Sequence, residues 1–144
     1  GSAVNELTIA NGAGNNGPTL SSTGGGTNLN LTLTPKGTGS VGLAKAAYGA
    51  STITANGAAS TAASLIICNK GSALAVSLAD GTTDGEFKIF TNKGAGAATV
   101  TPDNFANGTS FTLLQNKATQ CIWDGSNWFM LNGADSASTG ISIT

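Results

Sequence analysis

The sequence predicts an all-β protein: a β-sandwich or barrel-like C-terminal domain preceded by an N-terminal β-rich oligomerisation segment, which we expect to be trimeric. Two observations predict this class. The 144-residue chain contains 21 glycines, and it is rich in Thr, Ser and Asn, residues that favour pleated strands and tight turns. Several short runs alternate apolar and polar residues, and these runs show no helical periodicity.

The composition divides the chain into parts of different character. Large apolar side chains are sparse in the first 60 residues, where Tyr48 is the only aromatic residue. A stretch of small residues at 49–62 suggests a boundary. We therefore assign residues 3–55 to an assembly segment and residues 56–144 to the C-terminal domain. Residues 1–2 are typical of a cloning remnant, and we expect the chain to be cut from a longer protein.

The C-terminal part is predicted to be a meander of short strands separated by Gly-rich turns. The run at 64–70 is continuously apolar, which predicts a strand buried on both faces. In the next run Leu74, Val76 and Leu78 alternate and share one face. Asp-Gly at 124–125 predicts a hairpin between the last two strands. The expected strands are 64–70, 73–80, 87–92, 97–102, 110–116, 119–124 and 127–132.

The N-terminal segment contains one run with a single apolar face, at 27–34. Three leucines alternate there with Asn and Thr, which predicts a strand. The segment has too little apolar surface to offset a backbone entropy cost of about 1–2 kcal/mol per ordered residue. We expect identical chains to meet around a symmetry axis, and the alternative is a strand that caps the C-terminal sheet of the same chain. The predicted intersubunit core is Leu29, Leu31, Leu33, Val41 and Leu43.

The sequence offers little catalytic chemistry. It contains no histidine, which removes Ser-His-Asp and Cys-His sites. We therefore predict a protein that is not an enzyme and that needs no cofactor or metal. The net charge is -1, and the six basic residues are all lysine, so a surface that follows nucleic-acid phosphates is not expected. Its apolar runs are far shorter than the ~20 residues of a membrane span, so no membrane partner is expected.

Two small groups of residues leave alternatives open. Cys68 and Cys121 lie in apolar runs, which favours buried free thiols, although a disulfide between them remains compatible with the sequence. Asp80, Asp84 and Glu86 bring three carboxylates close together in sequence. A solvated turn is favoured for them over a calcium site, because their spacing does not fit an EF-hand loop.

Two stretches carry a resemblance to a known class of protein. Residues 7–9, 14–19, 27–28 and 33–39 match a pattern within segment 4–43, which resembles a segment common in tail fibres and related appendage proteins of tailed bacteriophages. Gly26 departs from this pattern, since the family often has an acid there.

The second match lies in segment 96–131, which resembles a pattern of phage surface and capsid decoration-type proteins. Residues 116–118 replace its usual small residue. The matching residues are 99–102, Phe105, Gly108, Phe111, 123–125 and Trp128. The resemblance implies a virion structural role, with trimeric β-rich assembly frequent in such proteins.

Together these observations predict a non-enzymatic virion protein, a fibre or capsid decoration, that forms a stable homo-oligomer on the particle surface. Its expected partners are other copies and other virion proteins, after assembly in the host bacterial cytoplasm. One alternative is a module that binds a host-surface glycan or receptor, with Trp123, Asp124 and Trp128 as contacts. Core packing is the favoured interpretation for both tryptophans. Another alternative is a bacterial surface-layer or adhesin fragment.

Overall fold

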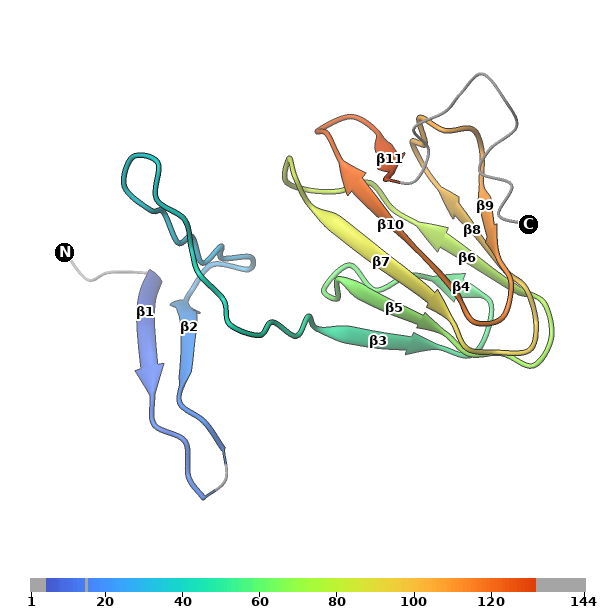
Figure 1. The fold of residues 1–144 in the computed structure, drawn as a ribbon. Coiled ribbons are helices and arrows are strands. Elements are labelled where there is room, and N and C mark those ends of the chain that lie inside the picture. Colours follow the sequence, from blue (N-terminus) through green and yellow to red (C-terminus); the bar gives the residue numbers. More distant parts are fainter. Residues whose placement is uncertain (1–4, 15, 132–144) are drawn as a thin grey trace. The chain divides into compact units, whose positions relative to one another are not determined.

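A computed structural model describes residues 5–14 and 16–131 of the chain (Figure 1). The chain forms two compact units, Gly1–Ala46 and Ala47–Thr144. All regular elements in the described residues are strands, which confirms the all-β class, and none of their sheets closes into a barrel. The described residues contain no helix that could cross a membrane. Residues 1–2, predicted to be a cloning remnant, lie outside the described part.

The first unit contains one antiparallel hairpin. Strand β1 (Asn5–Ala10) pairs with β2 (Thr19–Gly24), from Asn5 opposite Gly24 to Ala10 opposite Thr19. The Thr8 and Thr23 hydroxyl groups are hydrogen bonded at 2.8 Å across the hairpin. A hairpin of two strands that packs neither face against another element is only marginally stable in water.

The strand predicted at 27–34 is wrong. Residues 25–49 contain no strand, and this run has no ladder partner among the described residues. A strand needs a neighbour for its backbone hydrogen bonds, and alternation of Leu with Asn and Thr does not supply one. A side-chain hydrogen bond from Ser22 Oγ of β2 to the Leu29 carbonyl oxygen, at 3.3 Å, connects this region to the hairpin.

The second unit contains two sheets, which Figure 1 shows as separate layers. The five-stranded sheet has the order β11-β10-β7-β5-β3 and the four-stranded sheet has the order β4-β6-β8-β9. Buried side chains from both sheets form one hydrophobic cluster, so the sheets pack face to face. The strands are β3 (Ala50–Ile53), β4 (Gly57–Ala58), β5 (Leu65–Cys68), β6 (Leu74–Leu78), β7 (Phe87–Asn92), β8 (Ala98–Pro102), β9 (Phe111–Leu113), β10 (Lys117–Trp123) and β11 (Trp128–Met130).

The chain winds between these sheets instead of forming the predicted meander. From β3 to β8, successive strands lie alternately in one sheet and the other, so neighbours within each sheet are parallel. The antiparallel pairs of this unit are β8 with β9, β7 with β10, and β10 with β11. Parallel neighbours need a crossover connection, and here each crossover carries a strand of the opposite sheet. Short Gly-rich turns allow both paths, which is why the meander prediction was wrong.

Strands β3 and β4 lie in the 49–62 stretch, which the composition suggested as a boundary. Ile53 packs against the core, and β3 is paired with β5 along its whole length, from Ala50 opposite Leu65 to Ile53 opposite Cys68. The predicted division at 55/56 would therefore separate β3 from its own sheet. Small residues such as Ala50 and Ser51 can lie in a sheet when a neighbouring strand pairs with them. A run of small side chains therefore did not mark a domain boundary here.

The core lies between the two sheets. Leu74, Val76 and Leu78 share its inner face on β6, as predicted. Phe90 of β7 is fully buried and meets Phe111 of β9 edge-on, with ring centroids 5.6 Å apart. Such offset or edge contacts stabilise aromatic pairs by about 0.5–1.5 kcal/mol beyond their burial.

A buried asparagine holds the turns at one end of the sandwich. Asn92, at the end of β7, donates through Nδ2 to the carbonyl oxygens of Gly96 and Leu113, both at 2.9 Å. Its Oδ1 accepts from the Gly94 backbone N–H at 3.0 Å. Gly94 and Gly96 are required there, because a Cβ at either position would collide with the backbone of the preceding turn, at Lys70 or Ser72.

The variant Asn92→Ala tests this arrangement. It would remove the Asn92 amide from the Gly96 and Leu113 carbonyl oxygens and would leave the Gly94 N–H only its longer bond to the Cys68 carbonyl oxygen, at 3.3 Å. The loss of a partner costs about 1–3 kcal/mol where the group is buried. We expect the free energy of unfolding to fall by about 3 kcal/mol or more in urea titrations. Thr101→Ala, on the exposed face of β8, is the control and should change stability by less than about 0.5 kcal/mol. Equal effects of the two variants would contradict the role assigned to Asn92.

Candidate functional site

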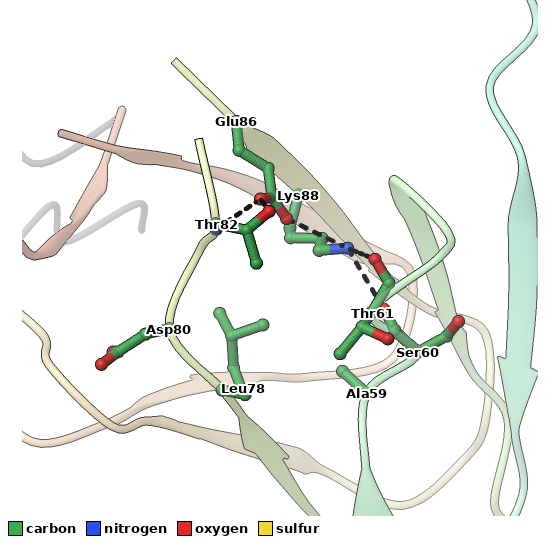
Figure 2. A pocket seen from close by; sticks show the side chains of 9 residues that line it. Ala59, Ser60, Thr61, Leu78, Asp80, Thr82, Glu86 and Lys88 are labelled. Carbon is green, nitrogen blue, oxygen red and sulfur yellow. Dashed lines mark hydrogen bonds and ion pairs between the residues drawn. The ribbon is translucent and has the colours of Figure 1, made fainter. Parts of the chain in front are cut away.

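The most buried charged side chain of the described residues belongs to Lys88, on β7 (Figure 2). Alternation along the strand directs Lys88, Phe90 and Asn92 inward, and only 3% of Lys88 is exposed. A buried lysine is unusual in a core and needs partners for its ammonium group. It is therefore the first place to look for chemistry.

The Lys88 ammonium is surrounded by backbone carbonyl groups. Nζ donates to the carbonyl oxygens of Ser60 and Thr61, each at 3.1 Å, and to that of Ala63 at 2.7 Å. Glu86 Oε1 lies 3.6 Å from Nζ and forms an ion pair. The other Glu86 oxygen accepts from the Thr82 backbone N–H at 3.0 Å. Figure 2 shows this chain of contacts running between the 59–63 turn and the 80–88 segment.

This geometry suits structure rather than catalysis. An ammonium has three N–H donors, and three carbonyl groups occupy them, so Lys88 has no free hydrogen or lone pair to offer a substrate. The adjoining cavity is about 40 Å³, whereas pockets for small-molecule ligands are typically ~300–1,000 Å³. Sequence analysis did not single out Lys88, although a lysine within the apolar run Phe-Lys-Ile-Phe was the available signal.

The three acids considered for calcium do not converge. Asp80 Oδ2 accepts from Asn104 Nδ2 at 2.8 Å, and Glu86 is engaged by Thr82 and Lys88. Asp84 lies against Gly125 of the last hairpin. Within the described residues, no three His, Cys, Asp or Glu side chains are grouped to hold a metal ion. In this structure the three carboxylates therefore serve three different sets of neighbours.

Two of the three residues considered as a receptor contact, Trp123 and Trp128, do not lie on the surface. Trp123 is 5% exposed and Trp128 is fully buried, with ring centroids 5.4 Å apart. The Trp128 indole N–H donates to the Ala79 carbonyl oxygen at 3.0 Å. Both side chains belong to the core, which confirms the favoured interpretation and makes the alternative contact through these rings wrong. Alternation along β10 and β11 places both rings on the inner side, where Trp128 meets Ala79 and Trp123 lies against Gly81, just after β6.

Asp124 of the same hairpin is exposed and shapes the turn. Its Oδ1 accepts from the backbone N–H groups of Ser126 at 2.9 Å and Asn127 at 2.7 Å. These two hydrogen bonds, led by that from Asn127, lower the pKa of the Asp124 carboxyl below its ordinary value. Asp124 therefore has a local structural role that needs no ligand.

The two cysteines are free and fully buried, as the favoured interpretation held. Burial raises the pKa of the Cys121 thiol to about 12 and raises that of Cys68 in the same direction. A thiol without a nearby cation and away from solvent is a poor nucleophile. Neither cysteine is therefore a candidate catalytic group.

The predicted oligomer-core residues are mostly exposed in the single chain. Leu29 is half-buried, and Leu31, Leu33, Val41 and Leu43 are 43%, 57%, 45% and 69% exposed. They lie in a segment without strands, so the chain itself does not bring them together as a sheet face. Comparison with protein-family models, with curated proteins and with solved structures finds no match for this chain.

The contacts of Lys88 predict how two variants will differ. Lys88→Met removes the donor for three carbonyl oxygens and leaves Glu86 without its ion pair, so we expect stability to fall by about 3 kcal/mol or more. Glu86→Gln keeps the carbonyl contacts, and we expect a loss below about 1 kcal/mol. Urea unfolding measures both values. If Glu86→Gln lost more stability than Lys88→Met, the ion pair, and not the carbonyl groups, would hold the lysine.

The buried Cys121 thiol predicts a loss of stability at alkaline pH. The unfolded thiol releases its proton above about pH 9, whereas the folded thiol keeps it up to about pH 12. The unfolded state therefore binds fewer protons in this window, and the free energy of unfolding falls as pH rises, by at most ~1.4 kcal/mol per pH unit. Cys121→Ala should show a flatter pH dependence between pH 9 and 11. Parallel curves for the two proteins would refute this assignment.

Proposed function

We propose that this chain is a non-enzymatic structural protein of a tailed-phage virion, a fibre or capsid decoration, that assembles as a homo-oligomer through its N-terminal unit. Three-fold assembly is the preferred form. The proposal places the protein on the particle surface, in contact with other virion proteins, after assembly in the host cytoplasm. Its biochemical content is mechanical: a weakly charged β assembly that resists unfolding and proteolysis.

The proposed assembly rests mainly on the lack of buried side chains in the described part of the first unit. Across residues 8–14 and 16–46, no side chain is buried, and several large aliphatic groups are exposed. Ordering such a segment costs about 1–2 kcal/mol per residue in backbone entropy, and burial within the described part of this unit offers little in return. Neighbouring copies would supply the missing apolar surface. Sequence resemblance to phage appendage proteins supports the same proposal.

The proposal of a structural, non-enzymatic role rests on the hydrogen bonds that the polar side chains make. The lysine, asparagine and aspartate groups with the most contacts hold turns of their own chain. The alternative as a glycan-binding module relied on two tryptophans that are buried. No observation in the described residues favours the adhesin alternative, so neither is carried further.

Light scattering of the full chain tests the assembly. We expect a mass near three times the 14.0 kDa of one chain. Leu31→Asp would place a charge in the proposed apolar seam at a cost above about 3 kcal/mol, so we expect it to dissociate or fail to assemble. Thr32→Asp adds the same charge at the neighbouring polar position and should stay assembled. A 14 kDa particle for the unmodified chain would sink the proposal, as would an unaffected Leu31→Asp oligomer.

A further inference from the structure

The outward side chains of the five-stranded sheet form an apolar surface. We call this surface the apolar outer face. The remaining outward strand positions carry Ala50, Thr52, Thr91, Ala118 and Gln120, so none of the outward positions is charged. The apolar outer face consists of Leu65, Ile67, Phe87, Ile89, Ile122 and Phe129.

Strand register makes this face continuous. Ile122 of β10 lies opposite Phe129 on one side and Phe87 on the other. Ile89 of β7 lies opposite Leu65 of β5. Opposed residues on adjacent strands are near neighbours on one face of a sheet, so the register links these apolar positions across four strands. Phe129 is 40% exposed, and β11 is the edge strand at this side.

The outer face of the other sheet is of the opposite kind. Its outward positions carry Ala75, Ser77, Thr99, Thr101 and Thr112, and the Thr99 and Thr112 hydroxyl groups are hydrogen bonded at 3.1 Å. That is the composition of a face exposed to water. The two outer faces of one sandwich therefore differ. No further sheet of the described residues covers either face, and Tyr48 packs edge-on against Phe87 of the apolar outer face, with ring centroids 4.9 Å apart.

The sequence of β5 adds a second argument. A strand that is covered on both faces reads as a continuous apolar run, whereas β6 and β8 of the other sheet alternate between buried and more exposed positions. The continuous apolar sequence Leu-Ile-Ile-Cys of β5 has the pattern of such a doubly covered strand. In the structure Ile66 and Cys68 are buried, whereas Leu65 and Ile67 are only half-buried.

We propose that the apolar outer face is an interface with a second copy of this chain. This inference rests on the proposed homo-oligomer and adds a second seam to it. A face without charges offers nothing for a charged partner to pair with. An apolar surface of a second copy can meet this face without burying an unpaired charge, which costs several kcal/mol.

The face is too small to form a stable interface by itself. Strand spacing of about 4.8 Å and rise of about 3.3 Å per residue give a projected area of roughly 400 Å² for the sheet. A stable interface buries about 800 Å² per partner, so the sheet supplies about half. A second copy also brings the exposed aliphatic side chains of the first unit. An unrelated partner would have to match two different surfaces.

The test compares matched lysine variants on the two outer faces of the full chain. Ile89→Lys places a charge at the centre of the apolar outer face, and Ser77→Lys places one on the polar face. We expect Ile89→Lys to weaken assembly by more than about a hundredfold in light scattering across a concentration series. Ser77→Lys should match the unmodified chain. Near-UV circular dichroism of the buried tryptophan pair reports whether each variant is folded.

Thiol labelling provides a second measurement that does not depend on the lysine variants folding. The native cysteines are fully buried, so a maleimide reads only an introduced thiol in the folded chain. We expect Gln120→Cys to label at least about tenfold more slowly than Ser77→Cys in the assembled protein. In the Leu31→Asp background, which separates the copies, both should label at similar rates.

The outcomes separate this inference from the proposed function. A monomeric unmodified chain overturns both. An oligomer in which Ile89→Lys and Gln120→Cys behave like their Ser77 controls overturns only the second seam. Slow labelling of Gln120→Cys that persists in separated chains also overturns it, because a segment of the same chain would then cover the face.

Discussion

Burial of apolar side chains between two sheets is the interaction on which the described structure depends. Phe90, Phe111 and Trp128 fill the space between the layers. Each large aromatic side chain removes about 150–250 Å² from water. Parallel strands such as β5 and β7 gain no stability from a local turn between them, so without this shared core their pairing would not offset the entropy of the crossovers.

Winding between the sheets creates a second requirement, which polar side chains meet. At every passage from one sheet to the other, the backbone leaves its ladder, and buried carbonyl and N–H groups need other partners. Lys88 and Asn92 lie near the two ends of β7 and serve opposite ends of the sandwich in the same way. The first binds the 59–63 turn and the second binds the 93–97 turn. Their burial therefore follows from the topology and does not require a substrate.

The sequence predicted elements well where the pattern was local and poorly where it depended on partners. Strands β5 to β11 lie where alternation and turn residues placed them. Alternation along β7 places Lys88 and Phe90 on one face, but the sequence alone does not show that this face is the inner one. A lysine inside could not be expected before the three carbonyl groups of the 59–63 turn were known, since they come from a distant segment.

The two failures of the strand prediction have one physical cause. Residues 27–34 have the alternation of a strand, but no described segment pairs with them. Residues 50–58 have few large side chains, yet they contain β3 and β4 because β5 and β6 provide neighbouring strands for pairing. Pairing, which a single sequence does not display, decided both cases.

The same reasoning separates the two proposed interfaces. Exposed leucines of the first unit lack both a ladder and a core, whereas Ile89 and Leu65 already sit in a rigid sheet. A partner would have to order the first unit on binding, at an entropic cost, whereas the apolar outer face is preorganised and would contribute its burial without that cost.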